Sequence, residues 1–202
     1  MTGLTERSLM SQRVLLLLLL AFGLFRSTQA QSPQDQWDAA DMKTVRLAPA
    51  AFPKLPKNIV QALEKRGCRI PQAFADPNPH NAISGEFARI GQTDWAVLCS
   101  VNRVSSILIF WAGSVDNTSE IAKAPDKNLL QRIDDKGNIG YSRAISPAGK
   151  DYIDKHYQAY ADVGAPKPPP IDHEGIDDAF MEKGSRVHYF YGGKWMGLTG
   201  SD

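Results

Sequence analysis

The side chains best suited to chemistry lie in one short acidic segment near the C-terminus. Asp172 and Glu174 stand at alternate positions before Gly175, and Asp178 follows that glycine by three residues. Carboxylates at such spacings around a glycine are typical of loops that wrap a hard cation in oxygen, and calcium is the natural ion for them. The segment therefore predicts a calcium site at Asp172, Glu174 and Asp178. No other cofactor is expected.

Two departures from such loops weaken the expected site. Pro170 stands where a first carboxylate is usual, and Met181 stands where a bidentate acid is usual. The remaining oxygens would hold calcium only weakly, with a dissociation constant of about 0.1 to 1 mM. The alternative, which the incomplete ligand set favours, is a solvated acidic turn. In that turn Asp172 is a cap, or Asp178 fixes a β-turn through its own backbone.

No catalytic motif stands out elsewhere in the chain. His173-Glu174 does not begin a zinc-protease helix, because Asp177 rather than a histidine comes four residues after His173. Nucleophile-elbow and phosphate-loop patterns are missing as well. These observations leave enzymatic activity open and favour a protein that is not an enzyme. The histidines are scattered over different expected elements: His80, His156, His173 and His188.

The two cysteines, Cys68 and Cys99, are expected to form a disulfide. An even number of cysteines is usually paired in a chain bound for an oxidising compartment. Closing a loop of this length would stabilise the fold by about 3 to 4 kcal/mol in the chain-entropy model. A catalytic thiol is therefore not expected.

The N-terminus has the order of a secretory signal peptide. Arg7 and Arg13 precede the apolar run 14–22, and small residues lie near Ala30. Arg26 follows soon after the run, which has roughly half of the ~20 apolar residues that a membrane span needs. We expect cleavage after Ala30, a secreted or periplasmic product, and no stable membrane anchor. The alternative is retention as an anchor.

The charge balance argues against nucleic acid as a partner. The formal net charge of +1 falls to about −1 when Glu6 and the three arginines of residues 1–30 are removed. That leaves no excess of positive charge for a polyanion. The expected partner is an envelope or extracellular protein or glycan.

A helix and three strands are expected in the first half of the mature chain. The helix would span 56–66, because a proline suits its first turn and Gly67 ends it. The strands would span 82–87, 94–99 and 106–111. The last strand is apolar along 107–111, so we expect it at the centre of a sheet and covered on both faces.

A second helix and a hairpin are expected in the second half. The helix would begin at Ser146, with Pro147 in its first turn, and end at Gly164. Residues 186–196 predict a β-hairpin with a two-glycine turn. Together the elements predict an α+β fold. It is a mainly antiparallel β-sheet with two helices packed on one side of it and one disulfide.

The expected domain organisation has three parts. Residues 1–30 are the signal peptide, and residues 31–53, which are polar and then rich in Ala and Pro, are a flexible lead-in. Residues 54–202 are a single globular α+β domain, since the length suits one core better than two.

Residues 85–97 carry Gly, acid, Phe, Gly and Asp-apolar-Ala-Val at a spacing that resembles the FG-GAP (VCBS-type) repeat of β-propeller proteins. In that family the loop holds calcium through Asp and Asn, whereas Ala88 and Ile90 stand at the corresponding places here. The resemblance implies the scaffold without the metal. Residues 171–180 align with the stretch, which indicates an internal duplication. A propeller of at least four blades does not fit this length.

The pairing of 94–99 with the later segment 172–180 also resembles a group of exported bacterial proteins of unknown function. This resemblance implies no activity. With the disulfide and aromatic side chains near the expected sheet ends, it favours an exported soluble binding or structural domain of the cell envelope. The alternative is a hydrolase that acts on an envelope polymer.

Overall fold

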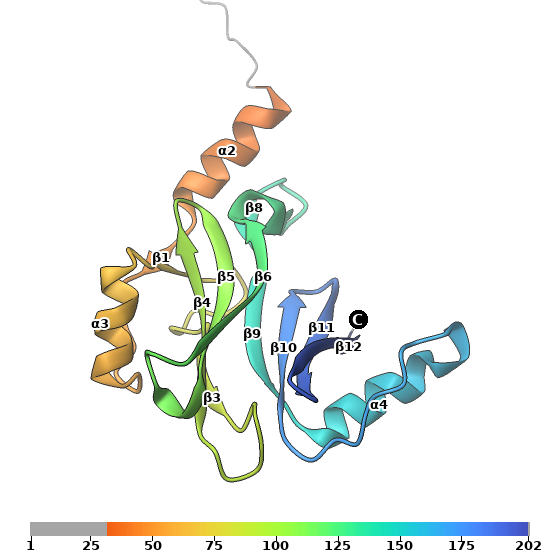
Figure 1. Cartoon of the computed structure of the whole chain (residues 1–202). Coiled ribbons are helices and arrows are strands. Elements are labelled where there is room, and N and C mark those ends of the chain that lie inside the picture. The colour runs from red at the N-terminus through yellow and green to blue at the C-terminus, as the bar shows by residue number, and fades with distance from the viewer. Residues whose placement is uncertain (1–31, 202) are drawn as a thin grey trace, which may run out of the picture. The chain divides into compact units, whose positions relative to one another are not determined.

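A computed structural model describes residues 32–201 of the chain (Figure 1). These residues form three α-helices and twelve strands in four antiparallel sheets. The α+β class and the single disulfide are therefore confirmed. No helix in this part of the chain is long and apolar enough to span a membrane. The expected signal peptide, residues 1–30, lies outside the described residues.

Two four-stranded sheets make up most of the fold. The N-terminal sheet has the order β3-β4-β5-β6, and the C-terminal sheet has the order β12-β11-β10-β9. The N-terminal strands are β3 (Ala82–Gly85), β4 (Asp94–Val101), β5 (Val104–Phe110) and β6 (Thr118–Pro125). The C-terminal strands are β9 (Arg143–Ala148), β10 (Gly175–Phe180), β11 (Gly184–Tyr191) and β12 (Lys194–Thr199).

Helices and two short sheets complete the fold. The helices are α2 (Pro33–Lys43), α3 (Lys57–Lys65) and α4 (Lys150–Tyr160). The short sheets pair β1 (Arg46–Leu47) with β2 (Ile70–Pro71), and β7 (Leu130–Arg132) with β8 (Ile139–Tyr141). Four 3-10 turns are η2 (Pro49–Ala51), η3 (Trp111–Gly113), η4 (Asp126–Leu129) and η5 (Ala161–Val163).

The sequence predicts two helices on one side of a single sheet, but the helices of the structure cover different sheets. Helix α3 covers one face of the N-terminal sheet, and the opposite face packs against the C-terminal sheet. Helix α4 covers the outer face of the C-terminal sheet. The reason lies in β4 and β5, whose side chains are buried on both faces, so that the sheet needs a cover on each side. The central position expected for 106–111 is confirmed by β5.

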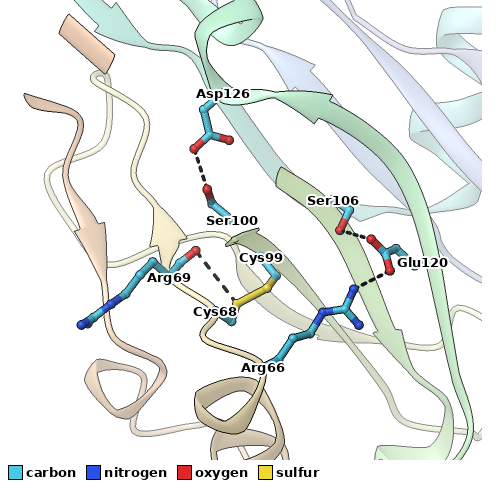
Figure 2. Close-up of a disulfide and its surroundings, with 8 residues drawn as sticks. All are labelled: Arg66, Cys68, Arg69, Cys99, Ser100, Ser106, Glu120 and Asp126. Atoms are coloured by element: carbon cyan, nitrogen blue, oxygen red, sulfur yellow. Dashed lines mark hydrogen bonds and ion pairs between the residues drawn. A yellow bond between two sulfur atoms is a disulfide. The ribbon is translucent and has the colours of Figure 1, made fainter. Parts of the chain in front are cut away.

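The end of α3 delivers the first cysteine to the sheet. Gly67 takes a positive φ of 73°, and the Gly67 and Cys68 N–H groups bond back to the carbonyls of Glu64 and Leu63 at 2.9 Å each. This is the Schellman end of a helix, which favours glycine at its left-handed residue. Figure 2 shows the disulfide that then joins Cys68 to Cys99 in β4, with the two Cα atoms 5.3 Å apart.

The second predicted helix begins later than expected. Ser146 and Pro147 lie in β9, which pairs with β10 along its full length, and α4 begins only at Lys150 after Gly149. A Ser-Pro pair is a common helix start, but β9 is an edge strand, where the missing N–H of proline is tolerated. Tertiary pairing therefore decided this boundary.

Residues 33–53, expected as part of a flexible lead-in, contain α2, β1 and the turn η2. One guanidinium anchors them, because Arg46 bonds to Asp126 through Nε at 3.0 Å and through Nη2 at 2.8 Å, and also to Asp41. Asp126 is fully buried and also accepts a 2.6 Å hydrogen bond from Ser100 of β4 (Figure 2). No stripe of apolar residues marks α2, so a pattern search for core helices overlooks it.

Asn81 joins the two halves of the fold. It is fully buried, and its Nδ2 donates to the Pro71 and Arg143 carbonyls at 2.7 and 3.1 Å. Its Oδ1 accepts from the Ile145 N–H at 2.8 Å, and its own carbonyl accepts from the Leu98 N–H at 2.9 Å. The side chain of Asn81 thus connects β2 to β9, and its backbone carbonyl adds β4, which fixes where the two sheets meet.

Candidate functional site

A concave pocket of about 530 Å³ lies between the C-terminal end of α2, the proline-containing loop after β2, and the β7–β8 hairpin. We call it the loop pocket. Its volume falls in the range usual for ligand sites, ~300 to 1,000 Å³. It is lined by Ala40, Lys43, Thr44, Val45, Leu47, Gln72, Ala73, Phe74, Asp76, Pro77, Asn78, Pro79, Ile133, Ile139, Gly140 and Tyr141.

The loop wall of this pocket is locked by side-chain hydrogen bonds. Gln72 and His80 exchange two bonds, with the His80 N–H donating to Gln72 Oε1 at 2.9 Å and Gln72 Nε2 donating to the His80 carbonyl at 3.1 Å. The His80 ring accepts from the Ala73 N–H through Nε2, and its Nδ1 lies 2.7 Å from the Asn78 carbonyl. These partners fit a neutral ring with its proton on Nδ1. The wall is therefore formed before any ligand arrives.

One edge of β8 faces the loop pocket with open backbone groups. Asn138 and Ser142 bond to the β7 side at 2.8 Å each, so strand alternation turns the N–H and C=O of Ile139 and Tyr141 to the other edge. The Tyr141 carbonyl accepts from the Phe74 N–H at 2.8 Å. Ile139 lies opposite Arg132 at a non-bonded position of the β7–β8 register, and neither its N–H nor its C=O bonds to a segment outside this pair within residues 32–201. An incoming strand would find both a donor and an acceptor there.

The loop pocket has an apolar character at its mouth. Val45 lines it and is 58% exposed. Of the described residues that line the pocket, only Lys43 and Asp76 carry a formal charge at neutral pH. The pocket thus combines apolar walls with one charge of each sign.

In the acidic segment predicted to bind calcium, the carboxylates of Asp172 and Glu174 accept hydrogen bonds from other parts of the protein. The Asp172 Oδ1 accepts a hydrogen bond from the Tyr189 hydroxyl at 3.2 Å. The Glu174 Oε2 accepts from the Glu86 N–H at 2.9 Å, and the Glu174 N–H donates to the Glu86 carbonyl at 3.1 Å. A Cβ at Gly85 would lie 2.7 Å from that Oε2, so the glycine leaves room for the carboxylate. Glu174 therefore ties the segment to the loop after β3.

Asp178 lies within β10 between two basic side chains. Arg143 Nε and Nη2 donate to its two oxygens at 2.7 Å each, and His188 Nε2 lies 3.2 Å from Oδ2. Burial by itself would raise the pKa of Asp178, but the hydrogen bonds from His188 and Arg143 outweigh it and lower the pKa below its usual range. Asp178 is paired in a strand, so the alternative in which it fixes a β-turn is wrong.

The three carboxylates of the predicted calcium site are thus engaged by three separate sets of partners. Within the described chain, no group of three or more His, Cys, Asp and Glu side chains is arranged to hold a metal ion. Calcium binding at Asp172, Glu174 and Asp178 stays a prediction. The contacts of these side chains are structural.

The stretch 85–97, which carries the FG-GAP resemblance, is organised by Asp94. This carboxylate is fully buried. It accepts from the Ala88 N–H at 2.9 Å, from Gln92 Nε2 at 2.7 Å and from the Ala112 N–H at 2.8 Å. Asp94 therefore holds the loop after β3 against the start of β4.

Among the four histidines, all of which lie in the described part of the chain, only His188 is within hydrogen-bond distance of a carboxylate, that of Asp178. The His173 ring stacks on Tyr189, with centroids 4.4 Å apart, and each of its nitrogens lies 2.9 Å from a backbone carbonyl oxygen. His156 Nδ1 lies 2.8 Å from the Tyr152 carbonyl. His173 and His156 thus have local structural partners, and the hydrolase alternative stays untested.

No protein-family model, curated protein or solved structure matches this chain. The resemblances to FG-GAP repeats and to a group of exported bacterial proteins therefore stay predictions. What the chain does must be inferred from its own geometry.

Arg143 and Arg46 are not among the predicted site residues, and no role was predicted for His80. Arg143 shares a face of β9 with Ile145, and a lone cation in a core-facing row is a sign of a buried ion pair. The sequence gives less indication that Arg46 is part of an ion pair. Asp41 is close to it but is an unremarkable acid, and Asp126 is distant in sequence.

Proposed function

We propose that this chain is an exported binding domain of the cell envelope or extracellular space, and that its loop pocket holds a short, extended, apolar segment of a protein partner. The observation that carries the proposal is the open edge of Ile139 beside an apolar pocket. An extended peptide can add to such an edge through main-chain hydrogen bonds, while alternate side chains enter the adjoining pocket.

The shape of the pocket supports this kind of partner. The locked loop between Gln72 and His80 costs no ordering free energy on binding, which favours affinity. Val45 offers exposed apolar surface in the lining, where a partner's side chain would be removed from water. Lys43 and Asp76 supply polar contacts that would orient the segment.

Export is proposed from the N-terminal pattern of residues 1–30. The Cys68–Cys99 disulfide supports it, because structural disulfides persist in oxidising compartments. We accordingly propose a secreted or periplasmic protein whose partner is an envelope or extracellular protein.

A peptide-display selection against the mature chain tests the pocket. We expect enrichment of short apolar sequences that bind the wild-type protein. Their affinity should fall by at least about tenfold in Val45→Glu, because the charge must be desolvated when the pocket is filled. Val163→Glu is the matched control, since Val163 is 82% exposed and does not line the pocket.

Two results would refute the proposal. One is a selection that enriches no sequence above background. The other is a set of enriched peptides that bind Val45→Glu and Val163→Glu equally well, since such peptides would be using another surface. Equal melting temperatures of the two variants would exclude misfolding as the cause of any loss.

A further inference from the structure

A second concave site of about 360 Å³ opens between β6 of the N-terminal sheet and one face of the C-terminal sheet. We call it the charged cleft. Its charged and titratable lining residues are Lys123 from β6, Arg143 from β9, Asp178 from β10, and Arg186 and His188 from β11. Asp178 and Arg186 are partners in the strand register, so their side chains lie on the same face of the C-terminal sheet. Farther along the strands, this face packs against the N-terminal sheet. Four basic side chains thus meet one carboxylate.

Arg143 lines the charged cleft with part of its donor capacity unused. Its side chain is 4% exposed. Its Nε and Nη2 bond to Asp178, and Nη2 also donates to the Ala122 carbonyl at 2.9 Å. Its buried Nη1 has no hydrogen-bond partner within residues 32–201. A buried guanidinium normally satisfies its five N–H donors, so Nη1 is a donor without an acceptor in a side chain that lines the cleft.

The charged residues that line the cleft are mostly basic, although Lys123 also interacts with Glu120 outside it. Neither Lys123 nor Arg186 has an ion-pair partner among residues 32–201. The Arg186 guanidinium lies along β12 over Gly197, where a Cβ would come within 3.1 to 3.2 Å of its atoms. Among the residues that line the cleft, the three cations Lys123, Arg143 and Arg186 face the single carboxylate of Asp178.

We infer that the charged cleft binds a phosphomonoester group. A phosphomonoester carries a charge of about −1.5 to −2 at neutral pH and offers three acceptor oxygens. It therefore matches both the excess charge and the unpaired Arg143 Nη1, whereas a carboxylate would match only part of the charge. Leu129 and Phe180 also line the cleft and offer apolar contacts to the organic part of the ester. This site is separate from the loop pocket and does not depend on the function proposed for it.

Titration calorimetry at low salt with phenyl phosphate, inorganic phosphate and benzoate tests the inference on the mature chain. We expect saturable binding with phenyl phosphate tightest. Lys123→Gln and Arg186→Gln should each weaken it by roughly fivefold, the effect of one unit charge a few ångströms away in water. Lys194→Gln removes a cation at the opposite end of β12 and should leave the affinity within about twofold of wild type.

The outcomes separate the sources of the phosphate group. Tighter binding of phenyl phosphate than of inorganic phosphate supports an ester as the ligand, whereas equal binding would overturn the ester and identify the free anion. Benzoate binding as tightly as phenyl phosphate would contradict the match to a doubly charged group. An equal loss in Lys194→Gln, or no saturable binding by any probe, would overturn the site itself.

Discussion

Asp177 and Asp178 are neighbours in sequence but lie on opposite faces of β10, and the pKa values of their carboxyl groups shift in opposite directions. Burial raises the pKa of Asp177, and the hydroxyl groups of Ser185 and Tyr152 offset this only in part. For Asp178, the hydrogen bonds from His188 and Arg143 outweigh burial and lower the pKa. The alternation of a strand is therefore enough to give two adjacent acids different roles. A sequence pattern cannot distinguish them, because it does not show which face carries the cations.

The raised pKa of Asp177 leads to a prediction about stability and pH. A carboxyl group whose folded pKa is raised stabilises the fold at pH values below its ordinary pKa, and this contribution is lost as the pH rises through the folded pKa. Asp177→Asn should therefore have a higher free energy of unfolding than wild type at pH 7, and the gain should vanish near pH 3. Urea unfolding at both pH values measures this, with the exposed Asp116→Asn as the control. A variant that is less stable at pH 7 would contradict it.

The lowered pKa of Asp178 gives the opposite sign. Its contribution is present above the ordinary pKa of the group and is lost as the pH falls through the folded value. Asp178→Asn leaves Arg143 buried without its counter-charge and should cost about 3 to 5 kcal/mol at pH 7. The difference from wild type should narrow steadily as the pH is lowered from 5 to 2. If the unfolding free energies of wild type and Asp178→Asn differed by a constant amount from pH 5 to pH 2, the Arg143–Asp178 ion pair would not be the cause of the stability difference.

At the scale of elements, the sequence predicts those parts of the fold whose signals are local. Helix α3 has an apolar stripe and a glycine end, β5 is an unbroken apolar strand, and the β11–β12 hairpin has two glycines at its turn. Strand β9 was missed because its identity depends on pairing with β10, which is distant in sequence. Helix α2 was missed because its apolar residues do not form a continuous stripe: Trp37 and Ala40 pack on the core, and Arg46 ties Asp41 at its end to Asp126.

The tether of α2 can be tested by removing its central cation. Arg46→Met leaves the fully buried Asp126 without a counter-charge, and we expect a loss of about 3 kcal/mol in the free energy of unfolding. The double variant Arg46→Met with Asp126→Asn removes the uncompensated charge and should recover part of that loss. Urea unfolding of both variants measures the difference. A double variant that is less stable than Arg46→Met would argue that Asp126 does not need Arg46.

At the scale of the whole molecule, both candidate sites arise where separate elements meet. The charged cleft joins Lys123 to Arg143, Asp178 and His188 only because two sheets pack face to face. The acidic segment was conspicuous in sequence, yet in the fold its carboxylates form structural hydrogen bonds and an ion pair. The sequence therefore allowed the fold class and the disulfide to be predicted, but the sites depend on how the two sheets and α2 are assembled.

The central claim is that a partner segment adds as a strand to the open edge of β8. Residue-resolved amide hydrogen exchange, with and without a peptide selected against the mature chain, tests it most directly. The Ile139 N–H faces the loop pocket and bonds to no segment outside the β7–β8 pair among residues 32–201, so its exchange should slow at least tenfold when the peptide is bound. The Gly140 N–H, on the β7 side of the strand, should change little. Binding that leaves the Ile139 amide unprotected would contradict the account.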